Sequence, residues 1–262
     1  FGEEYKLGSF IIRILPLLVG LILFLNTNNK IKNILICFIL VISYLCIYIT
    51  GERTAILLTV ISSILLFILI KNIRIIIIFS SFFFLLGFSY IYIFYENVFL
   101  RVFNKTINQL NINSDQKISI FTAHHESIYT NAYLIFLDNP IFGVGPKMFR
   151  EICIKYEYAC STHPHNYFLQ LSAELGIFGL FFISLAFFYM LYKIYFLIKF
   201  RIYLTKNELN LSLCCLICGL INLFPFIPSG NFFNNWLSIL MYIPFGFFLY
   251  IDNIIINKRN IK

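Results

Sequence analysis

The chain has 262 residues, of which 60% are hydrophobic and only 12% are charged, and its net charge at pH 7 is +8. Together with a mean hydropathy of +0.85, this composition excludes an ordinary water-soluble domain. The positive charge does not indicate a nucleic-acid partner, because the basic residues cluster at the ends of apolar runs, where they orient helices in a membrane. The composition therefore predicts an integral membrane protein.

Apolar runs of membrane-spanning length recur along the chain. A helix needs about 20 apolar residues to cross the hydrocarbon core. The candidate runs cover residues 9–25, 33–50, 54–70, 74–95, 173–198, 209–227 and 232–251. The strand alternation of membrane barrels is absent from the sequence. We therefore predict an all-α fold, a polytopic transmembrane helical bundle of about seven spans with one large external loop that contains short helices.

The loops between these runs differ in charge. One side of the predicted bundle holds eleven basic residues and two acids, and the other holds nine basic residues and ten acids. Because positively charged loops stay in the cytoplasm, the first side is predicted to be cytoplasmic. The N-terminus of this chain is then outside and its C-terminus inside. The chain begins with Phe1, so we also expect an N-terminally truncated fragment of a longer membrane protein.

The sequence divides into three parts: transmembrane helices 1–4 at 1–95, a loop domain at 96–166, and transmembrane helices 5–7 at 167–262. In the loop, His124–Leu137 has the period of an amphipathic helix, with Ile128, Ala132 and Ile135 on one face. The proline and glycine residues that follow, at 138–146, predict the end of that helix and a turn. A second short helix is expected at 147–156.

Seven cysteines fall into two groups by location. Five lie in predicted spans, where they act as small packing residues: Cys37, Cys46, Cys214, Cys215 and Cys218. Cys153 and Cys160 lie in the external loop, where an oxidising compartment permits a disulfide. The sequence leaves that disulfide and two free thiols equally open. The spacing of cysteines and histidines fits no zinc motif, so we predict no metal site.

The segment Thr162–Asn166 places two imidazoles on a stiff turn just before the fifth predicted span. Proline fixes the backbone and disfavours a helix at the residue before it. Because histidine is suited to move a proton near neutral pH, His165 and His163 are candidate general bases. The alternative is a plain helix start, with Asn166 as its cap. Glu174 either orients a histidine or caps the helix.

Two arginines lie near the outer ends of predicted spans. Arg53 sits in a very short external turn, where a guanidinium can grip a phosphate through two parallel hydrogen bonds. The alternative is an ion pair with Glu52 or anchoring to lipid head groups. Arg13 lies about one turn inside the first span. It either snorkels to the head groups or faces the bundle interior as a lipid-phosphate ligand.

Four further cationic side chains of the loop are candidate ligands for an anionic head group: His124, His125, Lys147 and Arg150. The two histidines open the predicted loop helix, and the other two follow the glycine-rich turn. For each of them the alternative is an ordinary solvated position.

Four segments combine in a fixed order: Gly51-Glu52-Arg53-Thr54-Ala55, Asp138-Asn139-Pro140-Ile141-Phe142-Gly143-Val144-Gly145, His163-Pro164-His165-Asn166, and Glu174-Leu175-Gly176-Ile177-Phe178-Gly179. In this order and placement they resemble the C-terminal part of the bacterial O-antigen ligase and O-antigen polymerase superfamily. These proteins are polytopic membrane glycosyltransferases. The resemblance covers nearly the whole chain, and the joint pattern is more specific than any single segment.

The resemblance implies a reaction and its partners. Members of the superfamily take a glycan from undecaprenyl diphosphate at the periplasmic face of the inner membrane, with no nucleotide sugar, cofactor or catalytic metal. A ligase transfers the glycan to a sugar hydroxyl of the lipid A core during lipopolysaccharide assembly. A polymerase transfers it to another lipid-linked glycan. We expect a ligase-like activity, with the polymerase as the alternative.

The resemblance also assigns residues. His165 matches the histidine of the family's large loop, with His163 second, and Arg53 matches the arginine of its short external turn. The family's second arginine, at the start of the loop helix, has no counterpart in the matching stretch 121–126. In its place we expect one of four side chains: His124, His125, Lys147 or Arg150. We expect His165 and Arg53 to face one pocket at the outer leaflet.

A transporter or flippase for a lipid-linked glycan is the alternative from another functional class. Such folds often contain inverted repeats and helices broken at the bilayer midplane. The sequence shows no repeat, and its candidate polar residues gather toward the outer surface. This distribution favours an enzyme that works at the membrane interface.

Overall fold

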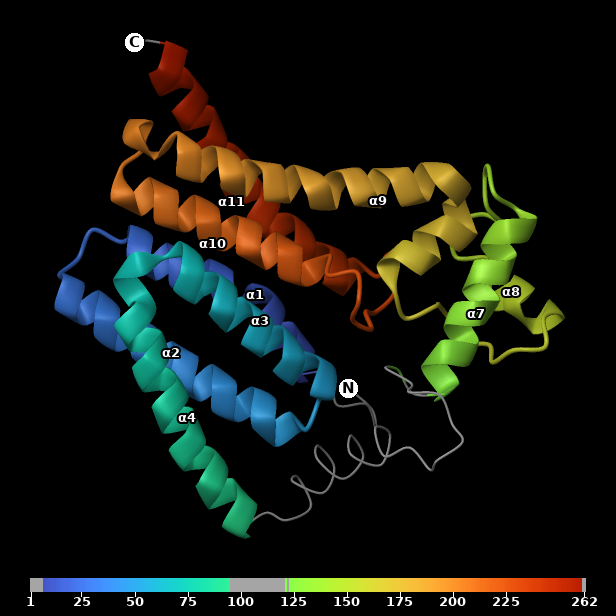
Figure 1. The fold of residues 1–262 in the computed structure, drawn as a ribbon, viewed down its shortest axis with the longest axis horizontal. Coiled ribbons are helices and arrows are strands. Elements are labelled where there is room, and N and C mark those ends of the chain that lie inside the picture. The colour runs from blue at the N-terminus through green and yellow to red at the C-terminus, as the bar shows by residue number, and fades with distance from the viewer. Residues whose placement is uncertain (1–6, 95–120, 122, 261–262) are drawn as a thin grey trace. The chain divides into compact units, whose positions relative to one another are not determined.

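The computed structural model describes residues 7–94, 121 and 123–260. Every regular element within these residues is a helix, which confirms the all-α part of the predicted fold class. The α-helices shown in Figure 1 are α1 (Leu7–Phe24), α2 (Asn29–Thr50), α3 (Arg53–Leu69), α4 (Arg74–Phe94), α7 (Ala123–Asp138), α8 (Phe149–Ile152), α9 (Tyr167–Lys199), α10 (Lys206–Asn222) and α11 (Asn235–Asn260). Short 3-10 turns occur at Lys71–Ile73, Cys153–Lys155 and Arg201–Tyr203.

Among the described residues, five helical segments are long and apolar enough to cross a membrane: α1, α2, Lys71–Tyr90 with most of α4, α9, and Asn235–Ile254 of α11. Each of the seven predicted runs coincides with a helix. The helices α3 and α10 have only 17 residues each, a length of about 26 Å against a hydrocarbon core of about 30 Å. The protein is therefore a multi-pass helical membrane protein, and the predicted total of seven spans stays a prediction.

The chain folds into two compact units. Unit 1 comprises Phe1–Lys105, Met190–Asn222 and Leu240–Lys262, and unit 2 comprises Thr106–Tyr189 and Leu223–Ile239. Unit 2 thus joins the first part of α9 and the connection between α10 and α11 to most of the predicted loop segment, of which the structure describes 121 and 123–166. Residues 96–120 of that segment lie outside the described residues, and the predicted division at 95 and 166 stays a prediction.

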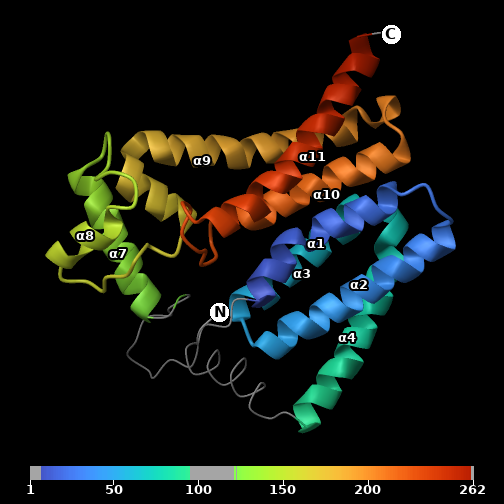
Figure 2. The same cartoon turned by 180° about the vertical axis from the view of Figure 1, so that it is seen from behind.

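The helix α10 is the centre of unit 1. All of its side chains from Asn210 to Asn222 are buried, and it packs against α1 and α3, as Figures 1 and 2 show from opposite sides. A Cβ added at Gly20 would lie 2.6 Å from the Cβ of Cys214, so the two helices touch where glycine leaves room. Because protein surrounds α10, it needs fewer strongly apolar side chains than a lipid-facing helix.

Unit 2 has its own small core around α7. Ile128, Ala132 and Ile135 are fully buried, together with Phe149 and Cys153. These three α7 residues confirm the predicted amphipathic helix and its inner face. The predicted second helix at 147–156 is present as α8 and the 3-10 turn that follows it.

A glycine breaks α9 inside unit 2. Gly176 has φ 65° and ψ −149°, which is not helical. Across this break, the Ile177 N–H donates to the carbonyl of Pro140 over 2.8 Å, and the Gly145 N–H donates to that of Glu174 over 2.9 Å. Two of the segments that carried the family resemblance, 138–145 and 174–179, therefore pack against each other.

The approximate ends of the predicted runs differ from the helix ends, and at three of them the difference is five residues or more. The fifth predicted run began at 173, but α9 begins at Tyr167, because Asn166 caps it there. The sixth ended at 227, but α10 ends at Asn222, before the turn that contains Pro225. The seventh covered 232–251, but α11 runs to Asn260, since helix continues past the apolar stretch into polar sequence.

Candidate functional site

Asn166 fixes the start of α9. Its Oδ1 accepts hydrogen bonds from the N–H groups of Phe168 and Leu169 at 2.9 and 3.2 Å, which is the geometry of a helix N-cap. Its Nδ2 donates to the carbonyl of Pro225 over 2.7 Å. The cap anticipated from the sequence is present, and it also ties α9 to the connection between α10 and α11.

His165 adopts an uncommon backbone conformation one residue before this cap. Its φ is 56°, in the left-handed region that few non-glycine residues occupy and that often marks functional positions. Its carbonyl accepts a hydrogen bond from the Ser229 N–H over 2.7 Å. Its ring Nε2 lies 3.1 Å from the Oγ of Ser161. Both the backbone and the ring of His165 are therefore held by neighbours.

Three imidazoles meet in unit 2. The ring centroid of His165 lies 4.1 Å from that of His163 and 5.4 Å from that of His125. The structure thus brings the start of α7 next to the turn before α9. The ring of His124 lies 6.2 Å from that of His125 and is exposed. Within the described residues, no three His, Cys, Asp or Glu side chains are placed to hold a metal ion.

Tyr129 lies beside these imidazoles, one turn after His125 in α7. Its ring centroid is 6.1 Å from that of His125, and its hydroxyl approaches the carbonyl oxygen of His165 at 3.5 Å. Burial raises the pKa of Tyr129 to about 12. The phenol therefore stays protonated at neutral pH and can donate a hydrogen bond within the site.

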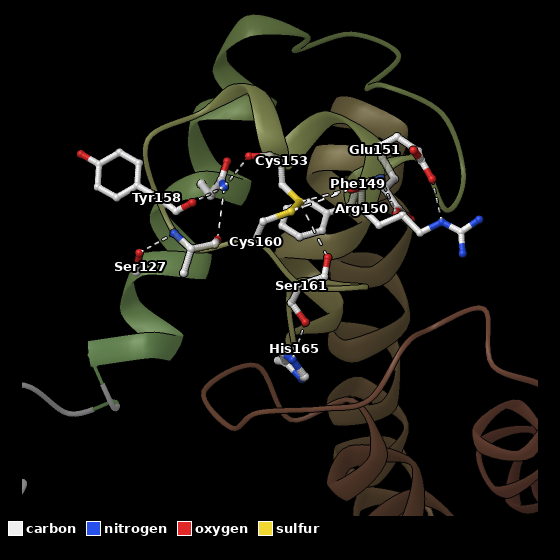
Figure 3. The surroundings of a disulfide bond; sticks show 12 residues. Ser127, Phe149, Arg150, Glu151, Cys153, Tyr158, Cys160, Ser161 and His165 are labelled. Carbon is white, nitrogen blue, oxygen red and sulfur yellow. Dashed lines mark hydrogen bonds and ion pairs between the residues drawn. A yellow bond between two sulfur atoms is a disulfide. The ribbon is translucent and has the colours of Figure 1, made fainter.

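Lys147 and Arg150 lie on the exposed surface of unit 2. Lys147 has a left-handed backbone with φ 62°. The Nε of Arg150 lies 3.2 Å from a carboxylate oxygen of Glu151, and both side chains are more than half exposed. Figure 3 shows Arg150 pointing toward Glu151 and away from His165. The described contacts therefore place His125, and not Arg150, beside His165.

Glu174 takes part in a buried network that joins three parts of unit 2. Its Oε1 accepts from the Phe149 N–H at the start of α8, and its Oε2 accepts from Gln170 Nε2, each over 3.2 Å. Gln170 also donates to Asn231 Oδ1 and accepts from the Phe232 N–H, each over 2.9 Å. Glu174 and Gln170 are fully buried, so the network fixes α8, α9 and the α10–α11 connection together.

Sequence reasoning missed Gln170 and Ser229. Gln170 had a usable signal, because a glutamine inside a strongly apolar helix must find partners when it is buried. It also stands one helical turn before Glu174. Ser229 had no such signal, since its contact with His165 is made by its backbone N–H.

The two cysteines of the loop form a disulfide. Cys153 and Cys160 are joined with their Cα atoms 5.4 Å apart, an ordinary separation for a disulfide. Figure 3 shows the bond between α7 and the turn that carries Ser161 and His165. Of the two arrangements that the sequence left open, the structure has the disulfide.

Arg53 lies in unit 1, where it is the first residue of α3. The preceding Glu52 caps a different helix, since its carboxylate accepts from the N–H groups of Gly8 and Ser9 at 2.8 and 3.1 Å, at the start of α1. Gly51 ends α2 with a left-handed φ of 65°. Gly51 therefore ends α2, and Glu52 caps the start of α1. Arg53 as a whole residue is partly exposed.

Arg13 faces the interior of unit 1. Its side chain is only 4% exposed, and its Nη1 lies 3.1 Å from the carbonyl oxygen and 3.3 Å from the Oδ1 of Asn222. A buried cation at this position satisfies the C-terminal end of α10. Snorkelling to lipid head groups does not describe this side chain, and its role as a phosphate ligand stays a prediction.

Comparison with known proteins identifies the family of this chain. A family model described as O-antigen ligase matches residues 37–184, which is more than half of the chain. No curated protein and no solved structure shows a significant match. The matched range contains the Arg53 turn, α7, the histidine turn and the broken start of α9. The chain therefore belongs to the O-antigen ligase family.

Proposed function

We propose that this protein transfers a glycan from undecaprenyl diphosphate to a sugar hydroxyl of an acceptor glycolipid, at the periplasmic face of the bacterial inner membrane. Membership of the O-antigen ligase family supports glycan transfer in lipopolysaccharide assembly. One observation carries the assignment of the site, namely the meeting of the His125, His163 and His165 rings at the start of α9. The acceptor in this proposal is the lipid A core, as for a ligase.

His165 is the general base of the proposed reaction. A sugar hydroxyl is a poor nucleophile until its proton is removed, and a neutral imidazole can take that proton in the transition state. The hydroxyl oxygen then bonds to the anomeric carbon, while the bond from that carbon to the diphosphate breaks and the diphosphate leaves with the electron pair. Direct displacement inverts the anomeric configuration. Product analysis that shows retention would contradict this mechanism.

Cationic side chains stabilise the leaving diphosphate in this proposal. Negative charge grows on the phosphate oxygens as the bond breaks, so fixed positive groups favour the transition state. Arg53 supplies one such group by its match to the family motif. His125 supplies a second one, in place of the arginine that relatives carry at the start of the loop helix. The exposed positions of Lys147 and Arg150 make them weaker candidates.

Substitution of His165 tests the base. In a strain that lacks the gene, the full-length protein with His165→Ala should reach the membrane but restore no surface glycan, because nothing removes the hydroxyl proton. Thr130→Ala is a matched control in the same unit, since the Thr130 hydroxyl donates to the Glu126 carbonyl within α7 over 2.9 Å. Normal lipopolysaccharide on gels of the His165→Ala strain would remove this residue as the base.

The exchange Arg53→Lys tests the proposed phosphate ligand. A lysine keeps the charge but cannot form two parallel hydrogen bonds, so transfer should fall by about tenfold or more. The same exchange at Arg201, an exposed residue in the turn between α9 and α10, should leave transfer unchanged. A wild-type rate in Arg53→Lys would leave anchoring to head groups as the role of this arginine.

Gel analysis of lipopolysaccharide after deletion of the full-length gene separates the ligase from its alternatives. Bare core together with accumulated lipid-linked polymer identifies a ligase. Core that carries a single repeat identifies a polymerase. A lipid-linked glycan that stays on the cytoplasmic side of the membrane identifies a transporter.

A further inference from the structure

We propose that Ser161 and the Cys153–Cys160 disulfide form a positioning arm for His165. In this arm Ser161 holds the imidazole through Nε2, and the disulfide holds Ser161. The effect of this arm on catalysis rests on the proposed function, in which His165 is the general base. None of the four segments that carry the family resemblance includes Ser161 or either cysteine.

The disulfide anchors the arm in the core of unit 2. Cys153 is fully buried and packs in the same cluster as Ile128 and Phe149. Cys160 is the residue directly before Ser161, so the covalent bond to Cys153 fixes the backbone on one side of that serine. The sulfur of Cys153 also lies 3.7 Å from the carbonyl oxygen of Ser161. The serine therefore has little freedom to move away from the core.

Two polar residues of α7 hold the same loop. Asn131, which is fully buried, donates from Nδ2 to the carbonyls of Cys153 and Ala159 at 3.1 and 3.3 Å. The N–H of Ala159 donates in turn to the Oγ of Ser127 over 2.8 Å. Figure 3 shows Ser127 on α7 at one side of the disulfide, and Ser161 and His165 at another. The loop is thus held at three successive points: the cysteine pair, Ala159 and Ser161.

The arm ends on the ring of His165. Ser161 Oγ lies 3.1 Å from Nε2, and we assign Nε2–H as the donor and the serine oxygen as the acceptor. A neutral imidazole that is protonated at one nitrogen has its lone pair at the other, so this tautomer makes Nδ1 the basic atom. The backbone of His165 is held independently by the Ser229 N–H over 2.7 Å. Ring and backbone together set the direction of the base.

The first test removes the hydroxyl. Transfer is measured with the purified full-length protein and the host strain's own undecaprenyl-diphosphate-linked glycan as donor. Ser161→Ala should lower the rate about tenfold, the size expected from one lost hydrogen bond that orients the base. Ser161→Thr keeps a hydroxyl and should restore most of the rate, and Thr130→Ala is the control. A loss as complete as that of His165→Ala would overturn a positioning role.

The pH dependence of the rate gives a readout that a merely structural role would not move. An accepting hydroxyl stabilises the protonated imidazole, so its removal makes His165 easier to deprotonate. The acid limb of the pH–rate profile of Ser161→Ala should therefore move to lower pH, and that of Ser161→Thr should not. An unmoved acid limb in Ser161→Ala contradicts the hydrogen bond to Nε2.

The second test concerns the disulfide. The double variant Cys153→Ala/Cys160→Ala should lose rate by a similar factor, and adding Ser161→Ala should cause little further loss, because both changes disable one arm. If the fold-reductions in rate of the two changes multiply, the disulfide does not act through Ser161, and the proposed arm is overturned. Dithiothreitol offers the same test without substitution, since it reduces the disulfide to two thiols and is itself oxidised. Reoxidation should restore the rate.

These outcomes separate the arm from the proposed function. Transfer at the wild-type rate by His165→Ala would show that His165 is not the base. An inactive His165→Ala together with a wild-type rate and pH profile in Ser161→Ala would leave the base in place and remove the arm. Melting temperatures of the purified variants check that they fold. If the cysteine double variant does not accumulate, the rate of the dithiothreitol-reduced wild-type protein tests the role of the disulfide instead.

Discussion

At the scale of the single residue, the proposed role of His125 as a cation for the diphosphate leads to a prediction about pH. An imidazole loses its charge as the pH rises through neutrality, whereas a guanidinium keeps it. If His125 is a cation for the diphosphate, its contribution disappears on the alkaline side of the pH–rate profile. The ring lies 5.4 Å from that of His165, so the charge that is lost is close to the proposed base.

The exchange His125→Arg should therefore preserve transfer at neutral pH and extend it to higher pH, while His125→Ala should lose most of it. The measurement is a pH–rate profile of the full-length protein for both variants. His124→Arg is the control, because it makes the same exchange at the preceding residue of α7, whose side chain is exposed. An unchanged alkaline limb in His125→Arg would assign the second cation to another residue.

All three imidazoles were candidate site residues in the sequence, but the meeting of their rings could not be predicted from it. His163 and His165 are neighbours, and Asn166 was recognisable as a cap because asparagine before an apolar run is a common helix start. His125 is separated from His165 by 40 residues. Only the packing of α7 on the core of unit 2 brings the two rings together, and no local pattern encodes that contact.

At the scale of the element, the break in α9 depends on one glycine. Gly176 is left-handed, and a Cβ there would collide with the carbonyl of Ile141. The exchange Gly176→Ala should lower the stability of the protein by about 2 kcal/mol or more, since it adds both backbone strain and a clash. The melting temperature and the amount of protein in the membrane measure this effect.

A matched exchange in another helix should behave differently. Gly246 lies in α11, and a Cβ added there meets nothing within 4 Å. Alanine is a better helix former than glycine by about 1 kcal/mol, so Gly246→Ala should leave stability unchanged or raise it. Equal losses at both positions would show that the left-handed conformation at 176 is not what the structure needs.

This break was not visible in the sequence for a physical reason. The stretch from Phe168 to Phe182 is mostly apolar, with Gln170, Ser172 and Glu174 as its polar residues. Hydropathy reports burial in lipid or protein but not backbone direction. A glycine inside such a stretch is compatible with a straight helix. The backbone hydrogen bonds of residues 140–145 to the carbonyls and N–H groups at the break determine the bend, and these contacts are not local.

At the scale of the whole molecule, hydropathy predicted where the helices lie but not how the chain divides into units. The seven apolar runs were found because crossing a bilayer requires length and apolarity together. Unit 2 takes residues from both sides of α10, including 223–239. Its partly buried contacts, such as Gln170 with Asn231 and Asn166 with Pro225, join segments some 60 residues apart, and no sequence signal identified the partner in either pair.

The orientation of the chain in the membrane is open to a direct test. The excess of basic residues predicts that the turn between α9 and α10 is cytoplasmic and that unit 2 is external, and the disulfide of unit 2 agrees with an oxidising compartment. Tyr133 in α7 and Ile202 in that turn are 53% and 86% exposed. In spheroplasts, an impermeant maleimide should label Tyr133→Cys at once and Ile202→Cys only after lysis, with the parent chain as the control for its own cysteines. The reverse labelling pattern would invert the topology and place the proposed base on the cytoplasmic side, where a periplasmic glycan transfer could not occur.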